Sequence, residues 1–430
     1  MVNNRYRESE IMLERALKTI PLGSQTFSKS YTHFPFGVSP FFVTHGDGSY
    51  IWDVDRNKYV DFINGLASVS VGYNFHKVND AVIEQIYKGV TFSLPTSIEA
   101  DVAELLVELI PCAEKVRFAK NGTDVTSAAI RLSRAYTGKE HILVCGYHGW
   151  QDWYIGSTTR DLGVPESVKN LTHAFAYNDI SSLNQYFEKY HNKVAAVIME
   201  PISGVWPISG YLAEVKNITH KNNAVLIFDE TVTGCRVSKG GAQELFNVTP
   251  DLATVGKGIA NGFPLSAIVG KAKIMDMMED IFFSGTFGGE TVSLSAAKVV
   301  LNMVKKDGLV EHLNAIGEKI ISGVRLIIDK TNLGNVVKIE GHPTFSYIDF
   351  LDTDGYSSSQ IKTFFLQEVF RRGILTLGGH NISYSHSDTD VIKLLNVYDE
   401  VLQMISDSIE NRTLQNLLLA EPPKPLFKVR

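Results

Sequence analysis

The sequence predicts an α/β protein in which a mainly parallel sheet, covered by helices on both faces, is joined to a smaller α+β unit. From about residue 78, helical segments alternate with short apolar runs. These runs are continuously apolar, which is typical of parallel strands that are buried on both faces. The two ends of the chain follow other patterns, a hairpin near the start and long helices near the end, which indicates a separate smaller unit.

The central segments supply the predicted sheet and its helices. Strands are expected at 115–119, 141–145, 194–200, 224–230 and 252–256, and helices at 78–89, 97–110, 123–137, 180–190 and 210–222. In segment 48–65, apolar positions alternate with others on both sides of the turn residues Asp55-Arg56-Asn57, which is typical of a hairpin. After residue 308, helices are expected at 308–330, 358–372 and 388–412, around strands at 336–341 and 344–350. We expect a large domain over 71–307 and a small domain built from 1–70 and 308–430.

Composition excludes several classes of function. The 430 residues carry a formal net charge of −6, with a pI near 6.1, so no basic face is available for nucleic acid. The chain has no run of 18 apolar residues that could span a membrane. Its first residues lack the apolar core of a signal peptide. Cys112, Cys145 and Cys235 lie far apart without metal-ligand spacing, so we expect a cytoplasmic protein without a bound metal.

One lysine stands between two glycines in "DLATVGKGIANGFPLS", residues 251–266. The spacing of Gly256, Gly258 and Gly262 is close to that of the dinucleotide-binding fingerprint, which requires a helix to begin within the glycine run. Pro264 interrupts that position, and "PLSAIVG" reads as a further strand. Lys257 therefore needs another explanation.

Charged residues end three of the predicted strands. Glu200 ends one apolar run, Asp229 and Glu230 end the next, and Lys257 follows "LATVG" directly. In such sheets the chemistry lies at the carboxyl ends of the strands. A single acid there more commonly caps the next turn. Acids at two strand ends and a lysine at a third favour a functional site.

This set of residues suits pyridoxal phosphate. A partly desolvated lysine such as Lys257 can form a Schiff base with a carbonyl. Asp229 is placed to hold the ring nitrogen in its protonated form. The turn 121–123 precedes a helix and can bind phosphate, although an ordinary helix cap by Asn121 or Thr123 is the better explanation of this turn taken alone. The segment "CGYHGW", 145–150, offers aromatic rings for stacking.

These motifs resemble class III aminotransferases of the fold-type I pyridoxal-phosphate family, and most of all the glutamate-1-semialdehyde 2,1-aminomutase-like proteins. The resemblance rests on six segments: "NGTDVTSAAIRLSRAYTGK", "YHG", "EP", "DETVTGCR", "GGAQELFNVTPDLATVGKGIANGFPLSAIVG" and "SGTFGGETVSLSAA". Their order and spacing make the combination specific.

The resemblance implies a role for each matching residue. Lys257 would bind the cofactor covalently and then move the proton, Asp229 would hold the pyridine nitrogen, and Tyr147 would stack on the ring. Cofactor contacts are also implied for Gly122, Thr123, Glu200, Thr231 and Thr286. Many relatives have a valine where this chain has Thr231. Thr286 would reach the phosphate of a neighbouring subunit, so a homodimer with shared active sites is expected.

The chain departs from the aminomutase pattern at the expected substrate end. Lys29 replaces an arginine, and a lysine cannot make a bidentate contact with a carboxylate. The loop after Tyr147 is shorter than the aminomutase lid, and Gly378-Gly379-His380-Asn381 replaces a segment with an acidic residue. A larger, hydroxylated substrate would suit Trp150, Trp153, Tyr154, His380 and Asn381. Packing within the core or a dimer interface explains such aromatic residues equally well.

The leading hypothesis is an aminotransferase that uses a small-molecule amino donor and an aldehyde or ketone acceptor. A sugar-derived acceptor is considered because the chain also resembles class III members associated with surface-polysaccharide biosynthesis. Alternatives are a 2,1-aminomutase, a pyridoxal-phosphate-dependent ammonia-lyase and a scaffold without activity. Intact Lys257 and Asp229 argue against the scaffold.

Overall fold

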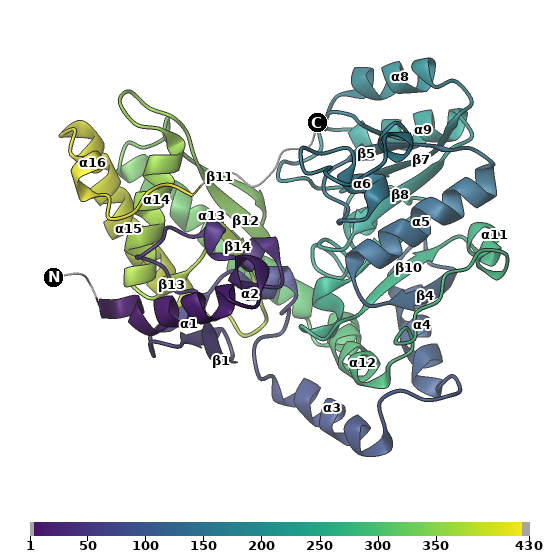
Figure 1. Cartoon of the computed structure of the whole chain (residues 1–430), viewed down its shortest axis with the longest axis horizontal. Coiled ribbons are helices and arrows are strands. Elements are labelled where there is room, and N and C mark those ends of the chain that lie inside the picture. The colour runs from purple at the N-terminus through teal and green to yellow at the C-terminus, as the bar shows by residue number, and fades with distance from the viewer. Residues whose placement is uncertain (1–3, 424–430) are drawn as a thin grey trace. The chain divides into compact units, whose positions relative to one another are not determined.

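The computed structural model describes residues 4–423, which form two compact units (Figure 1). Unit 1 contains residues 4–67, 71–75 and 311–423, and unit 2 contains residues 68–70 and 76–310. Each unit has its own hydrophobic core. None of the helices within residues 4–423 combines the length and the apolar character needed to cross a membrane.

Unit 2 is built on a seven-stranded sheet in the order β4-β10-β9-β8-β7-β5-β6. The strands are β4 Lys115–Ala119, β5 His141–Cys145, β6 Thr172–Ala174, β7 Val194–Met199, β8 Val225–Glu230, β9 Leu252–Val255 and β10 Ser266–Gly270. Only β10 runs against its neighbours, β4 and β9. The mainly parallel sheet predicted from the sequence is confirmed, and each predicted strand lies within one or two residues of its expected bounds.

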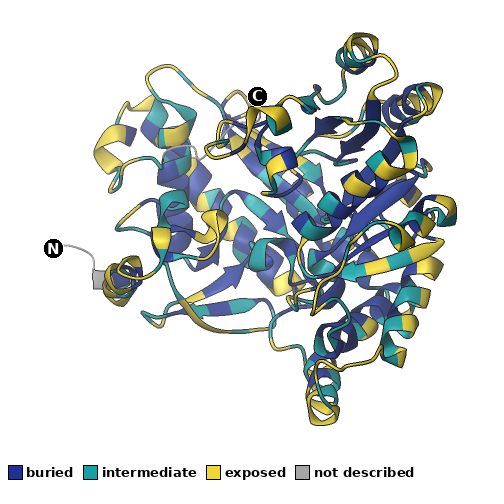
Figure 2. Ribbon diagram, turned by 45° about the vertical axis from the view of Figure 1, so that its right-hand side comes forward, coloured by how far each residue is buried: buried dark blue, intermediate teal, exposed yellow. Residues whose placement is uncertain are grey.

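Both faces of this sheet are buried, and successive residues of a strand face opposite sides. Val225 and Ile227 of β8 pack in a core with residues of α5, whereas Leu226 and Phe228 pack with α8 and α9. The central strands are accordingly dark blue in Figure 2. This burial explains why the strands are continuously apolar in the sequence.

The helices of unit 2 include the five expected ones. They are α3 His76–Lys88, α4 Ser97–Leu109, α5 Gly122–Thr137, α8 Ile180–Lys189 and α9 Tyr211–Lys221, with the additional α12 Thr291–Lys306. Short helices are α6 Asp152–Ile155, α7 Glu166–Lys169, α10 Ala242–Leu245, α11 Ala272–Met275, η5 Lys257–Ala260 and η6 Asp276–Glu279. A 3-10 turn, η5, begins at the lysine, and β10 follows it, so the glycine run does not open a dinucleotide-binding helix.

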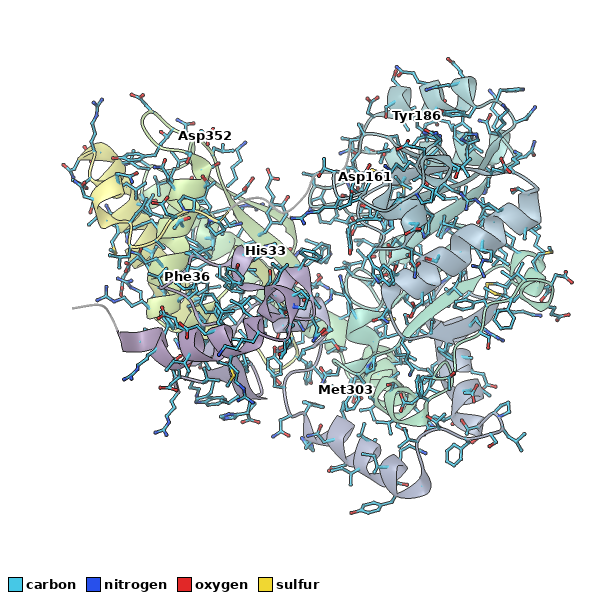
Figure 3. The ribbon with its side chains drawn as sticks, in the orientation of Figure 1. His33, Phe36, Asp161, Tyr186, Met303 and Asp352 are labelled. Carbon is cyan, nitrogen blue, oxygen red and sulfur yellow. The ribbon has the colours of Figure 1, made fainter. Side chains whose placement is uncertain are left out.

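The amino ends of two strands carry a stack of rings. His141 at the start of β5 lies 3.0 Å from His173 of β6, measured between Nδ1 and Nε2. Tyr190 stacks on both imidazoles with ring centroids 4.3 Å apart. Tyr186 of α8, which is labelled in Figure 3, adds a further ring. Burial lowers the pKa of His173 to about 4, which keeps this imidazole neutral near pH 7. The stack joins α8 to the sheet.

Unit 1 contains two small sheets and four long helices. The sheets are ordered β1-β2-β3-β13 and β11-β12-β14. Their strands are β1 Val43–Asp47, β2 Tyr50–Asp53, β3 Lys58–Asp61, β11 Val337–His342, β12 Phe345–Phe350, β13 Ile374–Leu375 and β14 Gly379–Asn381. Helices are α1 Arg7–Leu17, α13 Leu309–Lys330, α14 Ser358–Arg371 and α15 Asp388–Glu410, with α2 Asn64–Ala67, α16 Leu414–Leu417, η1 Asn4–Tyr6, η2 Pro21–Gly23, η3 Phe27–Lys29 and η4 Tyr31–His33. Strands β2 and β3 form the expected hairpin.

Candidate active site

Strand register brings Asp229 and Lys257 to neighbouring strand ends. In the parallel pair β8 and β9, Asp229 lies opposite Thr254 and Glu230 lies opposite Val255. The chain then continues through Gly256 to Lys257. The separation of 28 positions in the sequence therefore corresponds to one crossover between adjacent parallel strands.

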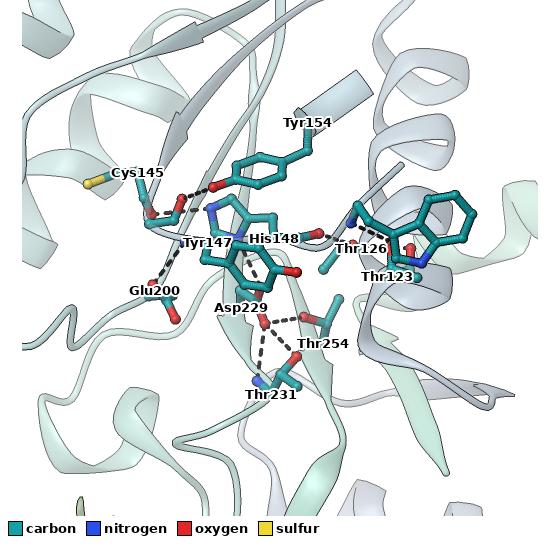
Figure 4. Close-up of polar contacts among 12 residues, drawn as sticks. Thr123, Thr126, Cys145, Tyr147, His148, Tyr154, Glu200, Asp229, Thr231 and Thr254 are labelled. Carbon is teal, nitrogen blue, oxygen red and sulfur yellow. Dashed lines mark hydrogen bonds and ion pairs between the residues drawn. The ribbon is translucent and has the colours of Figure 1, made fainter. Parts of the chain in front are cut away.

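Four hydrogen bonds hold the carboxylate of Asp229 (Figure 4). Its Oδ1 accepts from the backbone N–H of Thr231 at 3.1 Å, the Thr231 hydroxyl at 2.6 Å and the Thr254 hydroxyl at 3.0 Å. Its Oδ2 lies 2.8 Å from Nδ1 of His148, whose Nε2 lies 3.2 Å from the carbonyl oxygen of Cys145. Asp229 is 6% exposed, so these contacts fix a buried acid.

The pKa of Asp229 is lowered although the residue is buried. Burial alone raises the pKa of a carboxyl, but the hydrogen bond and charge of His148, together with the bonds from Thr231, outweigh it. Asp229 is therefore ionised at neutral pH, as an acid must be to hold a pyridinium proton.

Glu230, the next residue, has a structural role. It follows Leu226 and Phe228 in the alternation and so faces the opposite side of the sheet from Asp229. Its carboxylate accepts hydrogen bonds from Thr233, Ala242 and Gln243 and holds the turn that precedes α10. Of the two acids that end β8, only Asp229 lies on the α5 side.

Lys257 occupies a strained and desolvated position. Its φ is 47°, a left-handed conformation that non-glycine residues rarely adopt. The carbonyl of Gly258 accepts a hydrogen bond from the Ser70 hydroxyl at 2.5 Å, which anchors this turn. Burial lowers the pKa of Lys257, against the opposing charges of Glu200 and Asp229. The shift favours the neutral amine that reacts with a carbonyl.

Glu200 lies at the end of β7 and fixes the segment that carries Tyr147. Its Oε2 accepts the Tyr147 backbone N–H at 3.0 Å. A β-carbon at Gly146, where φ is 104°, would lie 2.4 Å from the same oxygen, so only glycine fits there. Burial raises the pKa of Glu200. The Tyr147 side chain is 51% exposed, which leaves the ring accessible to a ligand.

The N-terminus of α5 supplies the candidate phosphate site. Asn121 precedes the helix, and its backbone N–H is bonded to the Asp124 carboxylate at 2.8 Å. The Ser266 hydroxyl donates to the Asn121 carbonyl at 2.8 Å and ties this turn to β10. Backbone N–H groups in the first turn of a helix attract anions, so Gly122 and Thr123 can bind a phosphate.

Segment 147–154 is attached to α5 through several contacts. The Thr123 hydroxyl accepts a hydrogen bond from the backbone N–H of Trp150 at 3.3 Å, and the Thr126 hydroxyl donates to the backbone carbonyl of His148 at 2.8 Å. Trp153 is buried, and its Nε1 donates to Ser127 of α5 at 2.9 Å. The first turn of α5 and the aromatic segment therefore form one rigid surface.

Two of the expected substrate residues have structural contacts within unit 1. His380 is fully buried, with its ring nitrogens 3.1 Å from the Ser346 hydroxyl and 2.8 Å from the Tyr398 hydroxyl. Burial lowers the pKa of His380 to about 3. Its place is thus in the core, which corrects the expectation of a substrate contact. Asn381 donates from Nδ2 to the Ile63 carbonyl at 3.0 Å and helps to hold β14.

The remaining predicted residues are accessible. Lys29 of unit 1 is exposed, and its charge contributes to the electrostatic environment of Asp61. In unit 2, Thr286 is exposed on the loop before α12, and Trp150 is 65% exposed. None of the three side chains is committed to a buried hydrogen-bond network that would rule out binding.

Sequence reasoning missed the partners of Asp229. Thr254 stands inside the apolar run "LATV", where a threonine attracts no attention, and only the register with β8 reveals its contact. His148 was considered only as one of several aromatic rings. An imidazole next to the stacking tyrosine is a visible signal, but its bond to Asp229 joins residues 81 positions apart.

Together, the fold and the site define a pyridoxal-phosphate-dependent enzyme of fold-type I. An ionised buried acid and a desolvated lysine lie at adjacent strand ends, beside an accessible tyrosine ring and a helix N-terminus. The residues fit the cofactor, because Lys257 could bind its carbonyl, Asp229 its ring nitrogen, Tyr147 its ring face and the turn at Gly122 its phosphate.

Comparison with known proteins identifies the family. A model of the class-III aminotransferases matches residues 34–411, and the chain belongs to this family. The chain is 34% identical over 397 residues to the 3-aminobutyryl-CoA aminotransferase of Cloacimonas acidaminovorans, covering 90% of this chain and 94% of the relative. It is 31% identical over 425 residues to the glutamate-1-semialdehyde 2,1-aminomutase of Natranaerobius thermophilus, covering 93% and 98%.

A solved structure agrees with this assignment. The FumI protein of Sphingopyxis sp. MTA144, in its PLP internal aldimine form, superposes with a TM-score of 0.87 at 26% identity, covering 98% of this chain and 99% of that one. The chain is a class-III aminotransferase that uses pyridoxal phosphate, and its substrates are a small-molecule amino donor and a carbonyl acceptor.

Proposed function

We propose that Lys257 and Asp229 carry the transfer of an amino group between an amino donor and an aldehyde or ketone acceptor. The observation that supports this most directly is that the pKa values of both residues are lowered. The lowered pKa keeps the carboxylate of Asp229 charged, whereas it brings the amine of Lys257 closer to its neutral form. Pyridoxal phosphate supplies a carbonyl that bonds to amines and a protonated ring that withdraws electrons.

Each residue then has a defined task. The Lys257 amine would hold the cofactor covalently and would move the proton during the reaction. The Asp229 carboxylate holds the ring proton, Tyr147 stacks on the ring, and Gly122 with Thr123 binds the phosphate. Thr231 and Glu200 complete the proposed cofactor site, and Glu200 also fixes the backbone of Tyr147.

For the acceptor, we propose a hydroxylated carbonyl compound derived from a sugar. The support is that the Trp150 indole and the Tyr147 ring are both exposed, since flat aromatic faces pack against the apolar faces of sugars. A second candidate has different support. The relative from Cloacimonas is named for 3-aminobutyryl-CoA, which favours substrates that carry the amino group on the carbon β to the carbonyl group.

A third outcome, isomerisation of glutamate 1-semialdehyde, is suggested by the relative from Natranaerobius. Lys29 offers a carboxylate only a point charge, so we expect weak binding of that semialdehyde. The last alternative is elimination of ammonia by a pyridoxal-phosphate-dependent lyase.

One experiment separates these possibilities. The holoenzyme is incubated with glutamate and a panel of acceptors: keto-sugars, simple aldehydes and 3-oxoacyl thioesters. Separate incubations contain glutamate 1-semialdehyde alone or a β-amino acid alone. We expect 2-oxoglutarate together with an aminated sugar. An aminated thioester would favour the second candidate, and 5-aminolevulinate formed without a free intermediate would show that the protein is an aminomutase. Ammonia released from an amine alone would indicate a lyase.

We further propose a homodimer in which Thr286 reaches the cofactor phosphate of the second copy. Large exposed side chains on two segments of unit 2 support it: Tyr87 near the end of α3 with Leu94 after it, and Phe282 and Phe287 on either side of Thr286. Exposed apolar groups of this size indicate a protein interface. The segments are neighbours, because the N–H of Thr291 donates to the Val90 carbonyl at 3.0 Å.

A further inference from the structure

We propose that Thr231 is a positioning residue that acts through Asp229, its hydroxyl occupying one carboxylate oxygen so that the other is presented to the ring nitrogen of the cofactor. The proposal rests on the proposed role of Asp229.

The two carboxylate oxygens of Asp229 receive different numbers of hydrogen bonds. An ionised carboxylate has about four acceptor positions, two on each oxygen. Oδ1 of Asp229 already receives three donors, two of them from Thr231 and one from Thr254. Oδ2 receives only His148. The acceptor position that remains for a further N–H is therefore on Oδ2, and Thr231 supplies two of the three donors on Oδ1.

Packing gives the second argument. A β-carbon added at Gly122 would lie 3.2 Å from Cγ2 of Thr231, and one added at Gly256 would lie 3.5 Å from it. The Thr231 methyl group thus fills the space between the phosphate-binding turn and the turn that carries Lys257, while its hydroxyl faces Asp229. The Thr231 side chain therefore contacts the phosphate-binding turn, the turn that carries Lys257, and Asp229.

Charge gives the third argument. Each donor on Asp229 disperses its negative charge and makes the carboxylate a weaker base. A weaker base leaves the shared proton on the ring nitrogen, where it makes the ring electron-withdrawing. The bond from the Thr231 hydroxyl is the shortest of the four at 2.6 Å, so its loss should strengthen the carboxylate as a base.

Three variants isolate the hydroxyl. Thr231→Val keeps the shape but removes the donor, and Thr231→Ser keeps the donor but removes the methyl. Thr233→Val is the matched control, because buried Thr233 donates to Glu230 at 2.8 Å in the same way but lies on the side away from the site. Thermal unfolding of each variant reports whether it folds.

Two measurements follow on each protein. Titration of the apo-protein with pyridoxal phosphate gives the dissociation constant, and the 15N shift of ring-labelled cofactor reports the proton on the ring nitrogen. We expect Thr231→Val to bind the cofactor about tenfold more weakly, as the loss of one hydrogen bond to a charged group implies, and to move the 15N signal toward the neutral ring. Thr231→Ser should retain a signal near that of the wild type. Thr233→Val should change the unfolding temperature alone.

The proposal is wrong if Thr231→Val and Thr233→Val give the same 15N shift and the same affinity, or if Thr231→Ser loses the ring proton as Thr231→Val does. Asp229→Asn tests the underlying function separately. If Asp229→Asn kept both its turnover and a protonated ring, Asp229 would not be the partner of the ring nitrogen. If Asp229→Asn lost both while Thr231→Val resembled the wild type, only the role of Thr231 would be rejected.

Discussion

Lys257 combines two unfavourable features that a structural lysine would avoid. Its left-handed backbone, with φ of 47°, costs on the order of 1 kcal/mol, and burial opposes its charge. Surrounding contacts hold it there, including the Ser70 bond to the next residue. Such strain is concentrated at functional sites, and here it directs a reactive amine toward the carboxyl edge of the sheet.

The shifted pKa of Lys257 has a measurable consequence. Covalent attachment of pyridoxal phosphate requires the neutral amine, so the attachment rate of the apo-protein should reach half its maximum at a pH below about 10.4, the usual lysine value. Asp229→Asn should move this midpoint further down, because the negative charge of Asp229 stabilises the ammonium form. Stopped-flow absorbance across pH measures both. A midpoint at the ordinary value, or an upward shift in Asp229→Asn, would contradict the electrostatic account.

Single residues were predictable where local sequence determines their position. Asp229 and Lys257 stand out because charged groups end unbroken apolar runs, and strand ends are where parallel sheets place chemistry. The contacts of Thr254 and His148 depend on register and on a loop conformation, which short-range patterns do not contain. His380 looked accessible beside glycines, but β14 pairs with β12 and carries the imidazole into the core.

At the scale of elements, the site is a junction between the start of α5 and the segment that follows β5. Gly149, with φ of 106°, allows their close approach, because a β-carbon there would lie 2.5 Å from the Thr123 hydroxyl oxygen. The hydrogen bonds of Thr126 and Trp150 hold the two parts together. The phosphate turn and the stacking ring therefore cannot move independently.

Gly149→Ala should therefore damage cofactor binding as well as stability. We expect about 1–3 kcal/mol of destabilisation from backbone strain, and at least tenfold weaker binding because Thr123 and Tyr147 are displaced. Gly138→Ala is the control, since Gly138 also has positive φ, at the other end of α5, but no atom lies within 4 Å of an added β-carbon. It should cost about 1 kcal/mol and leave the affinity unchanged. Equal affinity losses in the two variants would argue against the junction.

Elements with strong periodicity were predicted well, and weaker ones were not. Helix α12 was not expected, because the first half of its buried face contains Ser293, Ser295, Ala296 and Ala297, which give little contrast with the polar face. Strand β6 has three residues, too few for a pattern. The direction of β10 depends on the short return after η5, and an apolar run has the same appearance in either orientation.

At the scale of the whole molecule, the proposed shared site predicts complementation between two inactive proteins. Lys257→Ala lacks the amine, and Thr286→Asp places a negative charge where the partner's phosphate would bind. A mixed dimer would contain one complete site, formed by the Lys257 of one copy and the Thr286 of the other. Mixing after mild dissociation should restore part of the activity.

Two controls accompany this test. Each variant alone should be inactive, and light scattering should give the mass of a dimer for both. Restoration in the mixture would support a site that is completed by the second copy. Dimers that exchange subunits without regaining activity would show that each site is contained in one chain, and a monomeric mass would contradict the interface at Tyr87 and Leu94.

A chemical label tests most directly whether Lys257 binds the cofactor. Borohydride added to the holoenzyme reduces the carbon–nitrogen bond between the cofactor and its lysine, which makes the attachment permanent. Peptide mapping by mass spectrometry then locates the added mass. We predict that it lies on the peptide that contains Lys257, and that Lys257→Ala binds the cofactor without acquiring the label or turning over substrate. A label on another lysine of the wild-type protein, or no label at all, would contradict the account.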